Sequence, residues 1–242
     1  ATGNYNAHVI AYPEIDWPKA SKEFVELLGL KWQKLTTQIE PHDYMAEIFD
    51  NLKRINVILL DMNRDIWTYI SMNYLKQKSI KGETGSSTMP HKVNPIDFEN
   101  SEGNLGLANS LLIHLSEKLP ISRMQRDLTD STVLRNIGVA LGYSLLAYKS
   151  LIGGMQKIEV NVPKLMEDLN NNWAVLTEAI QTVMRRYGAE DAYEQLKELS
   201  RGKEISKNDI QNIIKHLNIP EKAKKDLLNL SPSSYIGLAN KL

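Results

Sequence analysis

The chain has 242 residues, of which 42% are apolar, and its 29 basic side chains equal its 29 acidic ones in number. This balance excludes the strong positive field on which non-specific binding to nucleic acid or to an anionic membrane depends. The absence of cysteine excludes disulfides, thiolate metal sites and cysteine nucleophiles. The longest apolar runs, such as residues 57–60, are far shorter than the roughly 20 residues of a membrane-spanning helix. We therefore expect a globular, cytoplasmic protein with neither nucleic acid nor membrane as a partner.

Helical patterns begin at Asp16, a predicted N-cap, which is followed by Pro18 in the first turn and by Gly29 at the helix end. Residues 44–75 contain neither Gly nor Pro, and their apolar residues recur with alternating gaps of three and four. This heptad pattern predicts a helix of about 30 residues that packs lengthwise in a bundle, which other subunits could complete. The heptad seam consists of Met45, Ile48, Leu52, Ile55, Leu59, Met62, Ile66 and Tyr69.

Residues 81–94 break this periodicity with closely spaced Gly, Ser, Thr and Pro, which predicts a loop. Asn94 is the expected cap of the next helix, Pro95 its first residue, and Lys118 lies near its end. A charged turn then precedes a further apolar helix, expected over residues 131–152.

The pair Gly153-Gly154 is expected to end that helix, and we place a domain boundary there. Residues 1–154 are expected to form part of a long-helix bundle that includes the loop 81–94. Residues 155–242 show patterns of short helices with a Lys-rich tail and are expected to form a small helical domain. The fold class predicted from these patterns is all-α.

Two polar clusters are candidates for chemistry, whereas the five histidines lack the i, i+4 spacing of helical metal ligands. The loop before Pro95 combines hydroxyls with Lys92 and Asn94 at a helix entrance, which suits an anion-closing lid, although such loops are more often plain linkers. The second cluster has Arg126 and Arg135, whose guanidinium groups suit phosphate or carboxylate. A capped helix start with surface ion pairs is the alternative for this cluster.

The loop residues Gly85-Ser86-Ser87-Thr88-Met89-Pro90-His91-Lys92-Val93-Asn94-Pro95 resemble the signature Gly-Ser-Ser-x-Met-Pro-x-Lys-x-Asn-Pro of the fumarase and aspartase superfamily. Within it, the chain is most similar to the bacterial adenylosuccinate lyases. His91 supports this, because fumarases and aspartases generally carry Gly or Ala at that position and argininosuccinate lyases carry Gln. Further similar segments are residues 3–8, 37–44, 102–106 and 126–135, so the resemblance covers nearly the whole chain.

The resemblance implies a cofactor-free β-elimination in purine biosynthesis, which releases fumarate from adenylosuccinate, giving AMP, and from succinyl-aminoimidazole-carboxamide ribotide. It assigns Ser86 as the general base, activated by a closed, desolvated site and by the charge of Lys92. It assigns the nucleotide phosphate to Arg126, Ser131 and Arg135. The remaining implied substrate-binding residues are Gln38, Ser87, Val93, Asn94, Asn100, Thr132, Val133 and Leu134.

The resemblance also implies a general-acid histidine in an Arg-Thr-His-Gly-Gln-Pro type segment, which these 242 residues do not contain. We therefore expect a C-terminal fragment with a cut N-terminal end that is inactive alone. For the complete enzyme the resemblance implies a homotetramer with active sites built from three chains. The alternatives are another fumarate-releasing lyase, which gives no reason for the cluster around Arg126, and a helical interaction or oligomerisation module without activity.

Overall fold

A computed structural model describes residues 3–78, 94–189, 194, 196–197 and 205–242. The chain divides into two compact units, one of Ala1–Met72 with Gln77–Glu159 and the other of Asn73–Lys76 with Val160–Leu242. Within the described ranges, strands are limited to β1 (Leu75–Gln77) and β2 (Ile158–Val160), which pair with each other. The predicted all-α fold class is confirmed.

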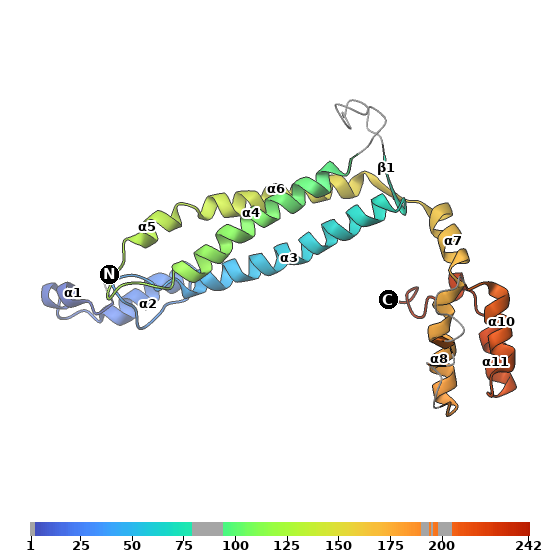
Figure 1. Cartoon of the computed structure of the whole chain (residues 1–242). Helices are drawn as coiled ribbons and strands as arrows, with labels where there is room; N and C mark the ends of the chain where they lie inside the picture. Colours follow the sequence, from blue (N-terminus) through green and yellow to red (C-terminus); the bar gives the residue numbers. More distant parts are fainter. Residues whose placement is uncertain (1–2, 79–93, 190–193, 195, 198–204) are drawn as a thin grey trace. The chain divides into compact units, whose positions relative to one another are not determined.

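The first unit contains all the long helices (Figure 1). Asp16 caps the second helix as predicted, because its Oδ1 accepts a hydrogen bond of 3.1 Å from the backbone N of Lys19. The helices of this unit are α1 (Asn6–Ala11), α2 (Trp17–Leu27), α3 (Asp43–Ser71), α4 (Ile96–Lys118), α5 (Thr129–Leu134) and α6 (Ile137–Gln156). The predicted helix of about 30 residues is α3, with 29 residues.

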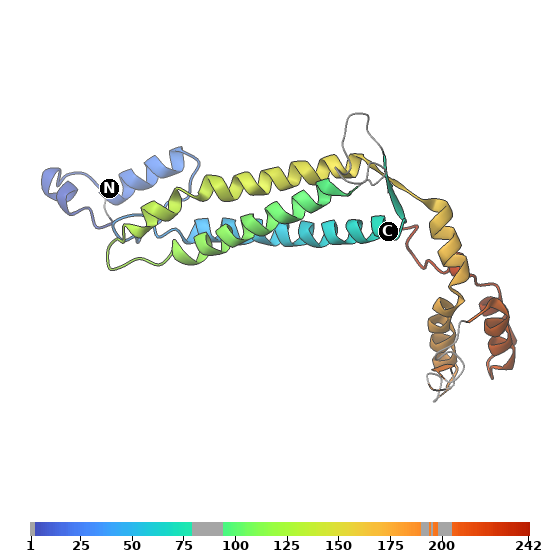
Figure 2. The same cartoon turned by 45° about the horizontal axis from the view of Figure 1, so that its top comes forward.

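Helix α4 lies against both α3 and α6, and the three helices run side by side in both views (Figures 1 and 2). Its buried side chains recur every three and four residues, which places them on one continuous stripe. Helix α6 presents mainly small residues to the bundle, and this lets its backbone approach closely. The buried stripe of α4 is Phe98, Ser101, Leu105, Ala108, Leu112 and Leu115, and that of α6 is Ala140, Ser144, Ala147, Leu151 and Gly154.

The heptad seam predicted for α3 is only partly buried. Ile66 is buried, but Ile48 and Ile55 keep 56% and 49% of their surface exposed. The fully buried positions are instead Phe49, Asn56 and Asn63, spaced seven residues apart. The side of α3 that contacts its neighbours therefore includes positions next to the apolar seam. Two of these positions are occupied by amides.

Two buried amides connect the three helices. Asn56 Nδ2 donates to Ser144 Oγ of α6 at 3.1 Å and to Asn109 Oδ1 of α4 at 3.0 Å, while its Oδ1 accepts from the hydroxyl of Tyr148. Asn63 Nδ2 donates to Ser101 Oγ of α4 at 2.9 Å. Leaving a buried polar group unpaired is costly, so these bonds favour one axial register of the helices.

The expected helix end at Gly153-Gly154 is wrong, because α6 continues to Gln156. Gly154 is buried where α6 crosses the start of α4, and a Cβ atom there would lie 2.8 Å from Phe98 Cζ and 3.0 Å from Asp97 Cβ. A glycine is required by close helix packing here, not by helix termination. The compact units divide after Glu159, so the proposed domain boundary at 154 falls inside α6 and stays a prediction.

Two other helix boundaries differ slightly from those predicted from the sequence. Pro95, not Asn94, occupies the N-cap position of α4. The helix expected over residues 131–152 is split into α5 and α6 around Arg135 and Asn136. The stretch Thr129–Gln156 is long and apolar enough to cross a membrane by length and composition alone. In the fold this stretch is divided between two helices, and the small-residue stripe of α6 packs on α4.

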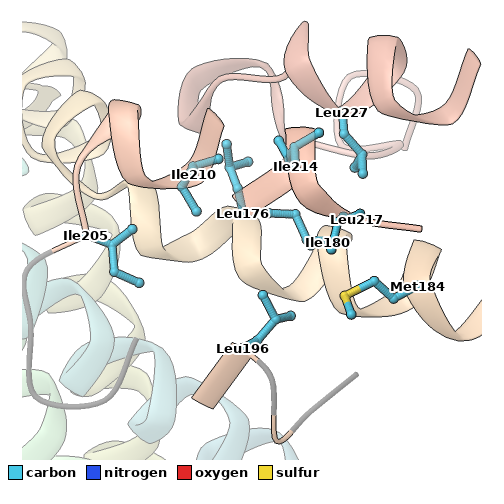
Figure 3. Close-up of a cluster of buried hydrophobic side chains, with 9 residues drawn as sticks. All are labelled: Leu176, Ile180, Met184, Leu196, Ile205, Ile210, Ile214, Leu217 and Leu227. Carbon is cyan, nitrogen blue, oxygen red and sulfur yellow. The ribbon is translucent and has the colours of Figure 1, made fainter. Parts of the chain in front are cut away.

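The second unit forms its own apolar core from short helices (Figure 3). Helix α10 begins with a capping box in which Ser206 N donates to Asp209 Oδ2 at 2.9 Å and Asp209 N donates to Ser206 Oγ at 3.3 Å. The elements of the second unit are α7 (Val162–Asn171), η1 (Trp173–Leu176), α8 (Thr177–Arg186), α10 (Lys207–His216), α11 (Glu221–Leu228) and η2 (Pro232–Ser234). The core side chains are Leu176, Ile180, Met184, Leu196, Ile205, Ile210, Ile214, Leu217 and Leu227.

Replacing Gly154 tests the close contact between α6 and α4. We expect Gly154→Ala to lower the free energy of unfolding by about 1–2 kcal/mol, because the added methyl group meets the buried ring of Phe98. The matched control is Gly153→Ala, whose Cβ meets open space among the described residues. This control should be neutral or gain up to about 1 kcal/mol of helix propensity. Urea unfolding of both variants measures the difference, and equal effects would contradict the packing argument.

Replacing Asn56 tests the buried amide network. We expect Asn56→Ala to lower the free energy of unfolding by about 2–4 kcal/mol, because Ser144 and Tyr148 lose partners in a buried site. Asn51→Ala is the control, since the Asn51 amide is exposed and bonds only to the Glu47 carbonyl of its own helix. That variant should change stability by less than about 0.5 kcal/mol in the same urea titration.

Candidate active site

The signature loop carries the predicted catalytic base, but most of it lies outside the described residues. Ser86, Ser87, Lys92 and Val93 fall in the undescribed range 79–93, so their roles stay predictions. Asn94 is the first described residue after this range and is half-buried at the entrance of α4. The loop residues therefore connect to the bundle at the N-terminal end of α4.

Asn100 lies one turn into α4 and has an exposed side chain that already makes hydrogen bonds. Its Nδ2 donates to Ser150 Oγ of α6 at 3.1 Å, and its Oδ1 accepts from Asn104 Nδ2 at 3.0 Å. A substrate atom would have to compete with, or add to, these bonds. Asn100 and Asn94 lie at the same end of the bundle.

The arginine cluster is at the opposite end, in the segment between α4 and α6. Asp127 anchors this segment, because its Oδ1 accepts a 3.0 Å bond from the backbone N of Thr129 and its Oδ2 lies 3.4 Å from Arg123 Nε. Lys118 of α4 is 4.0 Å away from the same carboxylate. The bond from Thr129, followed by the two cations, lowers the pKa of Asp127 below its ordinary value.

Arg126 and Arg135 are exposed, and neither forms an ion pair with any residue that the structure describes. A guanidinium without a carboxylate partner is available for a phosphate or carboxylate ligand. Ser131 is half-buried and Thr132 is exposed on α5 between the two arginines. The alternative of a helix start held by surface ion pairs applies to Arg123 but not to Arg126 or Arg135.

Val133 and Leu134 face the protein interior. Both pack against the apolar cluster of Phe49, Leu112, Leu115, Leu119 and Ala140 at this end of the bundle. Their side chains therefore anchor α5 to α3, α4 and α6. A contact of either residue with substrate would have to use its backbone.

Gln38 is brought close to the arginine cluster, although nearly ninety residues separate them in sequence. The backbone N of Gln38 donates to the carbonyl of Gln125 at 3.2 Å. Gln38 is exposed beside this bond, so its side chain lies at the same end of the bundle as Arg126.

Three further polar residues meet here, and sequence reasoning gave them no role. His42 Nδ1 lies 2.8 Å from Glu40 Oε2, and His42 Nε2 lies 3.8 Å from Asp130 Oδ2. Asp130 is only 6% exposed and is the one buried residue of α5. Each residue alone had a weak local signal, because Asp130 is three and four residues from apolar Val133 and Leu134 and His42 directly precedes a long helix, but neither signal pairs the two.

The predicted site residues thus form two groups within one copy of the chain. Asn94 and Asn100 lie at the start of α4, whereas Gln38 and residues 126–135 lie beyond its end. Figure 1 shows α5, which carries part of the second group, at the same end of the bundle as α2. Eighteen residues of helix between Asn100 and Lys118 span about 27 Å at a rise of about 1.5 Å per residue. The expectation that Asn100 lines the same site as Arg126 therefore requires more than one copy.

Two cavities in the described parts of the chain contain none of the predicted site residues. One, of about 540 Å³, lies between α2 and the segment before α3 and includes Trp32 and Tyr44. The other, of about 1300 Å³, is in the second unit and includes Trp173 and Lys207. No group of three or more His, Asp or Glu suited to a metal ion occurs among the described residues.

Known proteins similar to this chain match it along nearly its whole length. The family model "Adenylosuccinate lyase C-terminal" matches residues 122–236, and the model "Lyase" matches residues 1–108. The adenylosuccinate lyase of Haemophilus influenzae is 62% identical over 242 residues, which are 100% of this chain and 53% of that protein. The adenylosuccinate lyase of Escherichia coli K12 is 60% identical over 239 residues, 99% of this chain and 52% of that protein.

Solved structures show the same fold at lower sequence identity. A 3-carboxy-cis,cis-muconate lactonizing enzyme from Pseudomonas putida matches with a TM-score of 0.63 and 22% identity, over 90% of this chain and 50% of that one. A fumarate lyase:delta crystallin from Brucella melitensis matches with a TM-score of 0.57 and 18% identity, over 90% and 47% of the two chains. The helical bundle and the sequence matches agree: this chain is similar along its whole length to adenylosuccinate lyases and spans about half the length of the curated relatives it matches.

Proposed function

We propose that this chain supplies the general base and the phosphate cluster of an adenylosuccinate lyase. The reaction is the elimination of fumarate from adenylosuccinate, giving AMP, and from succinyl-aminoimidazole-carboxamide ribotide, two steps of purine biosynthesis in the cytoplasm. The observation that carries this proposal is 62% identity to an adenylosuccinate lyase over all 242 residues. Every fixed position of the superfamily signature at residues 85–95 also agrees.

The proposed chemistry divides between this chain and a partner histidine. Ser86 removes the proton from Cβ of the succinyl group, and the adjacent carboxylate takes up the resulting negative charge. Lys92 stabilises both the ionised serine and that charge. The Cα–N bond then breaks, its electron pair leaves with the purine amine, and the acid histidine returns one proton to this nitrogen. The proposed reaction requires no cofactor.

Each part of the substrate is proposed to be bound by residues from both groups, and therefore by more than one copy of the chain. Ser87, Lys92, Val93, Asn94 and Gln38 hold or orient the succinyl carboxylates. The free guanidinium groups of Arg126 and Arg135 support a phosphate site, which Ser131, Thr132, Val133, Leu134 and Asn100 complete. A lyase for argininosuccinate, aspartate or malate has no phosphate to place on these arginines, so the cluster favours a nucleotide substrate.

We propose that the complete protein is a homotetramer whose active sites draw residues from three copies. The separation of Asn100 from Arg126 by the length of α4 supports shared sites. Broad apolar surfaces on the outer faces of two long helices support the assembly, because large exposed apolar patches mark interfaces. These exposed residues include Ile55, Val57 and Ile58 of α3 and Leu145, Leu146 and Ile152 of α6.

Joining this chain to the remaining half of the Haemophilus influenzae relative tests the proposed activity. We expect the joined protein to release fumarate, measured by the absorbance loss on adenylosuccinate cleavage, and this chain alone to release none. Ser86→Ala in the joined protein should reduce kcat by about 10²–10⁴-fold, the contribution of a general base.

Ser110→Ala is the matched control, since the Ser110 hydroxyl is exposed on α4 and bonds to the Gly106 carbonyl. It should retain the full rate. Fumarate release by this chain alone that Ser86→Ala abolishes would contradict the need for a partner histidine. A joined protein that folds but leaves adenylosuccinate unchanged would contradict the proposed function.

A charge on the apolar face of α3 tests the proposed assembly. Ile58 is 67% exposed, and Ile58→Lys should shift the joined protein from tetramer to smaller species, because a buried lysine without a partner destabilises an interface. Asn240→Lys adds the same charge at an exposed position outside the long helices, so it is the control and should leave the mass unchanged. Sedimentation equilibrium measures both masses, and an unchanged tetramer in Ile58→Lys would exclude this face from the interface.

A further inference from the structure

We propose that His42 is a positioning residue that, together with Glu40, fixes Asp130 and so sets the place of the phosphate-binding residues on α5. This inference rests on the proposed function, because it assigns a purpose to residues around the proposed phosphate cluster. It adds a connection between the segment that carries Gln38 and the segment that carries Arg126 and Arg135.

The first observation is that two neighbouring side chains each leave a buried polar atom without a hydrogen bond. Among the described residues, His42 Nε2 and Asp130 Oδ1 are both buried and have no hydrogen-bond partner. Buried polar atoms are nearly always paired in native proteins. The distance of 3.8 Å from His42 Nε2 to Asp130 Oδ2 is about 1 Å longer than a hydrogen bond, so a small movement of α5 would let Nε2 donate to Asp130 when both imidazole nitrogens carry a proton.

The second observation is that Glu40 fixes the imidazole. Its Oε2 lies 2.8 Å from His42 Nδ1, and because a carboxylate only accepts, this nitrogen is the donor. Such a bond fixes the ring plane and directs Nε2 toward Asp130. The side chain of His42 is 13% exposed, so solvent offers Nε2 little competition.

The third observation is strained backbone in both of the segments that the contact joins. His42 has φ of 64° and Met124 has φ of 49°, in the left-handed region that residues other than glycine rarely adopt. The 3.2 Å bond from Gln38 N to Gln125 O lies between these residues and joins the two segments. Strained residues persist where surrounding contacts hold them, and such positions cluster at functional sites.

Asp130 is well placed to transmit this contact to a ligand. It directly precedes Ser131 in α5, a helix of six residues in which Asp130 is the buried residue. A phosphate held by Arg126, Ser131 and Arg135 would therefore depend on where Asp130 places α5. His42 touches neither the proposed phosphate nor the reacting atoms, so its effect is on binding geometry.

The test uses the joined protein and compares adenylosuccinate with its dephosphorylated nucleoside. His42→Asn removes the imidazole but keeps a residue that tolerates a left-handed backbone, and Asp130→Asn removes the charge at constant shape. We expect each variant to lower kcat/KM for adenylosuccinate about tenfold or more, mainly through KM, because small displacements of binding groups have effects of this size. The nucleoside should be cleaved at an unchanged rate, so the preference for the phosphorylated substrate falls by the same factor.

Two further variants sharpen the result. The double variant should lose no more than either single one, because the two residues act through one contact. His114→Asn removes an exposed histidine of α4 and should leave both substrates unaffected. If His42→Asn fails to fold, as judged by circular dichroism, Asp130→Asn alone decides.

Equal losses on both substrates, or a lower melting temperature with an unchanged substrate preference, would mean a purely structural role and overturn the inference. A wild-type joined protein that folds and releases no fumarate overturns the proposed function and this inference with it. An active wild type whose Asp130→Asn variant keeps its phosphate preference overturns this inference alone.

Discussion

The close approach of α6 to α4 is the constraint on which the first unit depends. Gly154 leaves no room for a Cβ atom beside Phe98, and Ala140, Ser144 and Ala147 keep the rest of the α6 stripe small. This contact sets where α6 begins and therefore where α5 must lie to reach it. The arginine cluster takes its position from α5, so a packing detail at one end of the bundle influences a candidate binding site at the other.

Buried amides complement this packing. Apolar contacts between long helices tolerate sliding by a turn, whereas the bonds of Asn56 to Asn109, Ser144 and Tyr148 are satisfied in one register. The amides also have a cost for α3, because they occupy inward positions that leucine or isoleucine would otherwise fill. The apolar side chains displaced from those positions, such as Ile55, lie on the outer face, where a second copy can bury them.

Sequence reasoning predicted the fold class and the long helices because heptad spacing and the absence of Gly and Pro are strong, local signals. It misjudged Gly154, because a glycine near a predicted helix end looks the same whether it terminates the helix or allows a neighbour to approach. It also chose Ile48 and Ile55 over Asn56 for the buried face of α3, since hydrophobicity alone does not show that an amide has buried partners. Some residues of the candidate site were also predictable from local signals. Arg126 and Arg135 were predictable from residue type and from the resemblance to the family. The contact of His42 with Asp130 joins segments nearly ninety residues apart, and no local pattern encodes it.

The two groups of candidate site residues lie at opposite ends of α4 within one copy of the chain. In sequence the loop that carries Ser86 leads into the start of α4 and the arginines follow its end, and about 27 Å of helix separates Asn100 from Lys118 within one copy. Antiparallel packing of a second copy along the exposed face of α3 would place the start of one α4 beside the end of another. The same apolar face that stabilises an assembly would then also bring Ser86 of one copy near Arg126 of another. In that arrangement the rigidity of α4 determines the distance between base and phosphate. The fine adjustment is left to short elements such as α5 and to the side chains, His42 and Asp130, that hold it.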